Sequence, residues 1–191
     1  MKTGKTKQLS PLQIAQEQEI VEDYQGQFPV ISLGLKGVKG SSYEEIEERL
    51  KDQITALYDQ YVYLQDQTWL TENQSSKLDN YLKNKVNTAA LKGSLRFLSE
   101  LLHKHFGQPV YILIDEYDTP INNAYLQLKQ EDPEAFKKVL DLFRDLLGDA
   151  LKTNPYLQKG LVTGILRIAK ANNFSALNNL PEYTQLDEEF A

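Results

Sequence analysis

The sequence predicts an α/β domain with a parallel sheet, on the basis of three short apolar runs and the long amphipathic segments between them. The runs cover residues 29–34, 110–114 and 160–165, and they are rich in the aliphatic and β-branched residues of buried parallel strands. The intervening segments are too long for hairpins and suit crossover helices. We therefore expect three parallel strands with flanking helices.

Each strand has its own local signals. The first lies in FPVISLGL at 28–35 and leads into a glycine-rich loop. The second, VYILI, is an unbroken apolar run that meets Asp115, and the third is GLVTGI. The short length of these runs favours strands over buried helices.

Helix signals fill the segments between the strands. Ser42 and Glu45 have the spacing of a capping box, Gly107 ends a periodic apolar stripe, and Asp132 precedes Pro133 as an N-cap precedes a proline at the first helical position. The expected helices cover residues 11–23, 42–64, 76–105 in one or two pieces, a segment from about 120, and 133–151.

Composition narrows the classes of function. The net charge of −6 disfavours broad electrostatic binding of nucleic acids. The absence of cysteine excludes disulfides, thiolate metal sites and a cysteine nucleophile. No apolar run approaches the roughly 20 residues of a membrane span, and the basic N-terminus lacks the apolar run of a signal peptide. We expect a cytoplasmic protein without a membrane contact.

The sequence YILIDEYD at 111–118 places acidic residues directly after a strand. Ligands of parallel sheets bind beyond the carboxyl ends of the strands, which is where Asp115 and Glu116 fall. In nucleotide hydrolases an aspartate at this position holds Mg²⁺, and the glutamate after it orients or deprotonates the attacking water. An acid that caps the next helix explains the pattern about equally well when this segment is taken alone.

The sequence LVTGILRIAK at 161–170 follows the third strand in the same way. Thr163 can sense a γ-phosphate or position water, and Arg167 can neutralise developing phosphoryl charge. Taken alone, the segment is more simply a strand, a turn at Gly164 and a surface arginine.

Together, YILIDEYDTPI and LVTGILRIAKANNFSALNNL resemble the AAA-ATPase-like domain family, which consists of large bacterial and archaeal P-loop proteins. FPVISLGLKGVKGSSYEEIEERLK and ALKGSLRFLSELLHKHFG are similar to further segments of that family. The resemblance runs through residues 12–187, between a polar, disordered N-terminus at 1–11 and a tail at 188–191. It implies a three-layer P-loop NTPase fold with ATP and Mg²⁺ as cofactors.

The resemblance also implies roles for individual residues. Asp115 and Glu116 stand at the family's Walker B acids, as the metal ligand and a catalytic residue. Thr163 and Arg167 are assigned as catalytic residues, and Asp118 and Gly164 as cofactor-binding residues, because they fall within the family's motif segments.

The family's phosphate-binding loop has no clear counterpart. Such a loop needs a glycine-rich turn after a strand, then Lys and Ser or Thr at a helix start. Gly4-Lys5-Thr6 has suitable residue types, but only three residues precede it. We therefore expect a truncated domain that binds or hydrolyses ATP only when the loop is supplied.

Two other hypotheses stay open. The chain could be a non-catalytic pseudo-ATPase module that binds a protein partner. It could also be a defence or mobile-element factor linked to nucleic acid, which is inferred only from the nuclease-like domain that family members often carry.

The resemblance implies a strand order of 5-1-4-3-2, so the three strands present here would be strands 2, 3 and 4. These are contiguous and can form a parallel sheet with strand 3 in the middle. Strand 4 would then be an apolar edge with unpaired backbone groups, which invites pairing with another chain. We expect self-association or a protein partner that supplies the missing strand.

Overall fold

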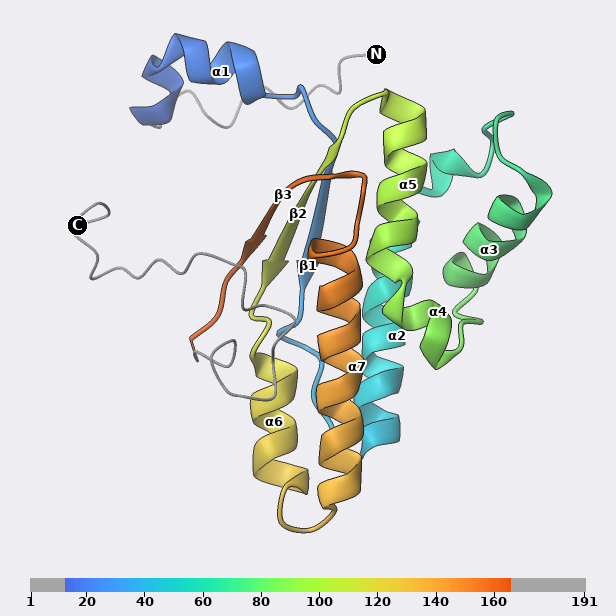
Figure 1. The fold of residues 1–191 in the computed structure, drawn as a ribbon, viewed down its shortest axis with the longest axis vertical. Coiled ribbons are helices and arrows are strands. Elements are labelled where there is room, and N and C mark those ends of the chain that lie inside the picture. Colours follow the sequence, from blue (N-terminus) through green and yellow to red (C-terminus); the bar gives the residue numbers. More distant parts are fainter. Residues whose placement is uncertain (1–12, 166–191) are drawn as a thin grey trace.

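The computed structural model describes residues 13–165, and its centre is a parallel sheet of three strands in the order β1-β2-β3 (Figure 1). The strands are β1 Val30–Gly34, β2 Val110–Asp115 and β3 Leu157–Val162. The middle strand is the one that carries Asp115. This confirms the predicted fold class, strand order and direction.

The third strand begins earlier than the sequence predicts, at Leu157 instead of residue 160. Leu157 pairs with Val110, and an irregularity in register separates this pair from the pairing of Tyr111 with Lys159. The early part of β3 is exposed at Gln158 and Lys159. Because an edge strand can pair through its backbone while its side chains stay in water, hydrophobicity did not mark this start.

Residues 13–165 also form seven α-helices and two short 3₁₀ helices, which are joined by turns and loops. The α-helices are α1 Gln18–Tyr24, α2 Tyr43–Asp59, α3 Glu72–Leu82, α4 Thr88–Lys92, α5 Ser94–Phe106, α6 Thr119–Leu128 and α7 Pro133–Leu151. The 3₁₀ helices are η1 Gln13–Gln16 and η2 Val62–Leu64. None of the helices in this part of the chain combines the length and the apolar character needed to cross a membrane.

Local capping explains where several helices begin and end. The Ser42 hydroxyl accepts a hydrogen bond from the Glu45 amide, and the Asp132 carboxylate accepts one from the Ala135 amide. Gly107 ends α5 in the left-handed conformation, with φ at 66°. These boundaries agree with the predicted caps.

Other helix boundaries differ from the predicted ones. The helix expected over 42–64 ends at Asp59, and the helical region expected over 76–105 consists of α3, α4 and α5. In the segment 65–75, between these two predicted helices, Thr71 forms a full capping box with Gln74 and starts α3. A polar surface segment of this kind has little hydrophobic periodicity, so the capping pair was its only helix signal.

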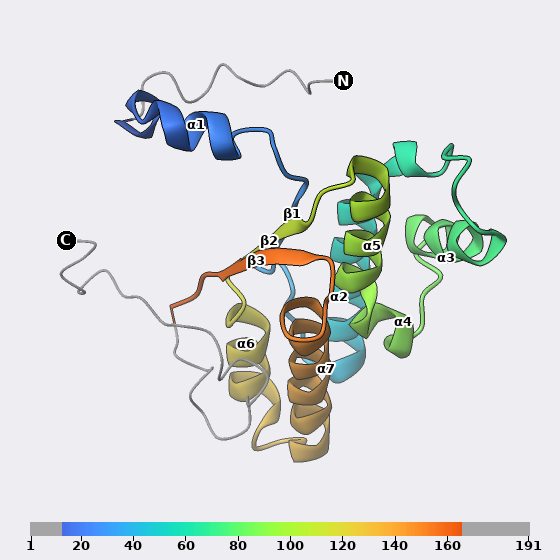
Figure 2. The ribbon, with the colours of Figure 1, turned by 45° about the horizontal axis from the view of Figure 1, so that its top comes forward.

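The helices α2, α5 and α7 pack against one face of the sheet (Figure 2). Ile31 and Leu33 of β1 and Ile112 and Ile114 of β2 point into this core and are buried. The alternate side chains lie on the opposite face, where Leu113 is 36%, Val30 is 44% and Leu161 is 58% exposed. Within residues 13–165, the packed helices therefore form one layer, and the second helical layer of a three-layer domain is not among them.

The Glu47 carboxylate ties α2 to α4. It accepts hydrogen bonds from Thr88 at 2.6 Å, Tyr43 at 2.9 Å and Lys51 at 3.2 Å. Burial by itself would raise the pKa of Glu47, but these donors outweigh burial and hold its pKa below the ordinary value. Burial and the neighbouring Glu47 raise the pKa of Tyr43 to about 12.

Candidate functional site

The two motif segments meet at the carboxyl ends of β2 and β3. The ladder between the strands continues past their ends, because the Thr163 amide donates to the Ile114 carbonyl at 2.8 Å. The Tyr117 amide then donates to the Thr163 carbonyl at 3.1 Å. On the other side of β2, the Leu35 amide donates to the Asp115 carbonyl at 2.9 Å. The backbone of residues 114–117 is therefore fixed from both sides, by the segment after β1 and by the segment after β3.

Asp115 and Thr163 face each other across this ladder. The Thr163 hydroxyl donates a hydrogen bond to Oδ1 of Asp115, and both side chains are exposed on the face of the sheet opposite α2, α5 and α7. The two motif segments therefore lie together at the carboxyl ends of β2 and β3. Arg167, which the resemblance assigns as a catalytic residue with Thr163, lies outside the described residues.

Glu116 sits at the turn that follows β2. Its φ of 53° is in the left-handed region, which is uncommon for a residue with a side chain. Oε2 of Glu116 accepts a hydrogen bond from the Thr119 hydroxyl at 3.2 Å, and its side chain is 35% exposed. The carboxylate is thus held in place while part of it stays accessible to water.

Lys36 is a residue at this edge that the sequence reasoning missed. Its ammonium lies 4.0 Å from Oε1 of Glu116 and is 83% exposed, so the ion pair itself contributes little to stability. Lys36 follows β1 by two positions. The rule that ligands bind beyond the carboxyl ends of strands, applied to the first strand, could have found it.

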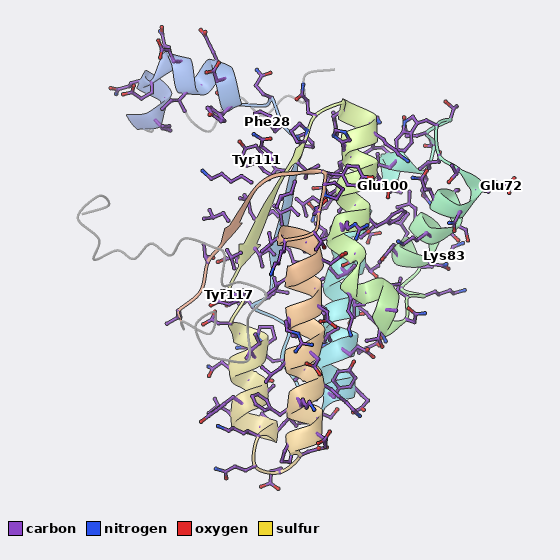
Figure 3. All side chains as sticks on the ribbon, in the orientation of Figure 1. Phe28, Glu72, Lys83, Glu100, Tyr111 and Tyr117 are labelled. Carbon is purple, nitrogen blue, oxygen red and sulfur yellow. The ribbon has the colours of Figure 1, made fainter. Side chains whose placement is uncertain are left out.

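Asp118 and Gly164 are packed against each other. Asp118 is 5% exposed, and its Oδ2 accepts a hydrogen bond from the Ile165 amide at 3.1 Å. A Cβ on Gly164 would lie 2.6 Å from Oδ1 of Asp118 and 2.7 Å from the Tyr117 ring. Figure 3 shows Tyr117 at the junction of β2 and α6. Although Asp118 is the N-cap residue of α6, it makes no side-chain capping hydrogen bond, so helix capping does not explain this acid.

The donor set suits a hard cation. Magnesium prefers oxygen ligands, keeps several waters and commonly takes only one or two carboxylates from the protein, so the Asp115 carboxylate and the Thr163 hydroxyl fit it. Between residues 13 and 165, no group of three or more His, Asp or Glu side chains is placed so that it could hold a metal ion. The same residues contain no Gly-Lys-Ser/Thr sequence, and Gly4-Lys5-Thr6 lies outside them.

A separate hollow of about 530 Å³ lies between α4 and α7, away from the strand ends. Two ion pairs connect helices beside this hollow, Lys92 with Asp145 at 2.8 Å and Arg96 with Asp149 at 3.0 Å. None of the motif residues within 13–165 lines it.

Comparisons with known proteins show which family the chain belongs to. A family model described as "Predicted AAA-ATPase" matches residues 1–174. A protein from Azotobacter chroococcum mcd 1, described as "Uncharacterized protein in vnfD 5'region", is 29% identical over 80 residues. That match covers 42% of this chain and only 14% of the relative. No solved structure matches the chain.

Proposed function

The chain belongs to the AAA-ATPase-like family, and on that basis we propose that it carries the Walker B-type part of a site that hydrolyses nucleoside triphosphates. One observation carries the proposal. The parallel sheet brings Asp115 and Thr163 from neighbouring strands to one edge, where the threonine hydroxyl donates to the carboxylate. Ligands of open parallel sheets bind at this edge.

In this proposal, Asp115 holds Mg²⁺ directly or through its water shell. Bound Mg²⁺ would neutralise charge on the β- and γ-phosphates of ATP. The Thr163 hydroxyl keeps the Asp115 carboxylate in one orientation and, being exposed, is accessible to a phosphate oxygen or water. Both groups are exposed, so neither requires a rearrangement of the core to reach a ligand.

We propose Glu116 as the residue that orients the attacking water and accepts its proton. Its carboxylate directly follows the metal ligand, is partly exposed and is steadied by the Thr119 hydroxyl. Arg167 is proposed, from the family resemblance, to neutralise charge that develops on the transferred phosphoryl group.

Tight binding of ATP also needs a phosphate-binding loop. Its backbone amides and lysine supply most of the contacts to the β- and γ-phosphates. Because residues 13–165 lack such a sequence, we propose that this part of the chain acts only with a loop supplied from outside it.

Titration of the full chain with MgCl₂, followed by amide NMR, tests the metal ligand. Saturable shifts are expected at residues 115–117 and 163–165, and Asp115→Asn should abolish them. Asp132→Asn is the matched control, since Asp132 also accepts a backbone amide but caps α7. The proposal fails if Mg²⁺ causes no saturable shift at these residues, or if Asp115→Asn leaves the shifts unchanged.

The second candidate is a non-catalytic module that binds a protein partner. The sheet formed by residues 13–165 supports it, because β3 is its last strand and Leu161, which pairs with Leu113, is 58% exposed. An exposed apolar edge can pair with a strand from a partner or a second copy. Sedimentation of the purified chain tests self-association, and a single monomeric species at high concentration would contradict it.

A further inference from the structure

The Asp118 carboxylate lies against Gly164 and is hydrogen-bonded to the Ile165 backbone, although the family resemblance assigns both Asp118 and Gly164 to a bound cofactor. The Asp118 carboxylate is almost fully buried, and its Oδ2 receives the Ile165 amide. Its other oxygen faces the space where a Gly164 side chain would begin. A carboxylate packed in this way is better placed to hold the protein than to meet a ligand from solvent.

Both backbone groups of Thr163 are hydrogen-bonded to the segment that contains the end of β2. The Thr163 amide donates to the Ile114 carbonyl, and the Thr163 carbonyl accepts from the Tyr117 amide. Two residues further on, the Ile165 amide donates to Asp118. The turn at 163–165 is therefore attached to the end of β2 and to the start of α6.

Gly164 allows this close approach. A Cβ at this position would come within 3.0 Å of both the Tyr117 ring and the Asp118 carboxylate, closer than Cβ atoms come in proteins. Tyr117 is 7% exposed, so its ring has little room to move aside. Any side chain at 164 would push the turn away from β2 and would move the Thr163 hydroxyl with it.

We propose that Asp118 and Gly164 are positioning residues, which lock the 163–165 turn so that the Thr163 hydroxyl stays on the Asp115 carboxylate. Asp118 acts through the Ile165 amide, and Gly164 acts by being small. The consequence for metal affinity rests on the proposed function of Asp115, but the lock itself does not.

Two substitutions of Asp118 separate positioning from direct ligation. An asparagine at 118 keeps a side-chain oxygen that can accept the hydrogen bond from the Ile165 amide, whereas an alanine has no such oxygen. In the full ¹⁵N-labelled chain, Asp118→Ala should speed exchange of the Ile165 amide proton with water. It should also raise the Kd for Mg²⁺, read at the Thr163 amide, about tenfold. Asp118→Asn should keep both values close to those of the wild type.

Gly164→Ala should have the same effects as Asp118→Ala. The matched controls are Gly37→Ala, where a Cβ meets no atom within 4 Å, and Asp132→Ala, which loses an amide acceptor in another element. Neither control should change the Ile165 amide or the Kd for Mg²⁺.

Each outcome decides the matter. Unchanged exchange at Ile165 in Asp118→Ala would overturn the lock. An equal loss of Mg²⁺ affinity in the Ala and Asn variants would make Asp118 a ligand and not a positioning residue. If the wild-type chain binds no Mg²⁺, the proposed function fails, and exchange at Ile165 still decides whether the lock exists.

Discussion

Replacing Thr163 by Val removes the hydroxyl that donates to Asp115 and keeps the size and β-branched shape of the side chain. A hydrogen bond to an ionised group contributes roughly 1.5–3 kcal/mol to stability. Because Thr163 and Asp115 are both exposed, water competes for the same groups, and we expect about 1 kcal/mol here. For a domain of this size that lowers Tm by about 2–4 °C.

A double-mutant cycle with Asp115→Asn isolates the pair. Urea unfolding without Mg²⁺ should give a coupling energy of about 1 kcal/mol between Thr163→Val and Asp115→Asn, above the roughly 0.3–0.5 kcal/mol by which independent mutations fail to add. Thr153→Val is the control, because it removes a threonine bond to Asp149 and should be additive with Asp115→Asn. A coupling energy within the additivity error would refute the idea that this hydrogen bond fixes the carboxylate.

Three further outcomes are expected. The purified chain should hydrolyse no ATP, because residues 13–165 lack a phosphate-binding loop. ATP hydrolysis above background that is lost in Glu116→Gln would contradict this prediction. Gly4-Lys5-Thr6 would then be the candidate for the phosphate-binding loop. The hydrogen bonds that lower the pKa of Glu47 stabilise the folded state fully above pH 4.5, the ordinary pKa of a glutamate. This stabilisation is lost as the pH falls through the lowered pKa that Glu47 has in the folded state. Glu47→Gln should flatten that part of the stability profile in urea titrations below pH 5, and an unchanged slope would count against the role of this carboxylate. Gly107→Ala forces a side chain into the left-handed conformation and should cost about 1–2 kcal/mol in thermal unfolding, unlike Gly37→Ala.

The sheet was the most predictable part of the fold. The face of the sheet that packs on the helices buries Ile31, Leu33, Ile112 and Ile114. Because these positions must be apolar, the strands are visible in the sequence as short apolar runs. The start of β3 escaped prediction because an edge strand can pair through backbone groups alone. The start of α3 escaped because Thr71 and Gln74 were not recognised as a capping box.

The candidate site was predictable in part. Asp115 and Thr163 could be placed at one sheet edge, since both follow apolar runs and parallel strands end on the same side. The contact of Lys36 with Glu116 depends on the path of the loop after β1, which no local pattern encodes.

By itself, the sequence determined the α/β class, the three strands and the residue types that stand at their carboxyl ends. These features follow from local patterns of apolar and polar residues. Only the tertiary structure decided which motif side chains reach solvent. Asp115 and Asp118 are three positions apart and chemically identical, yet one is exposed beside Thr163 and the other is buried under the 163–165 turn. The cause is the close approach of two segments some 47 positions apart, where Gly164 leaves room for the turn and the Ile165 amide needs an acceptor.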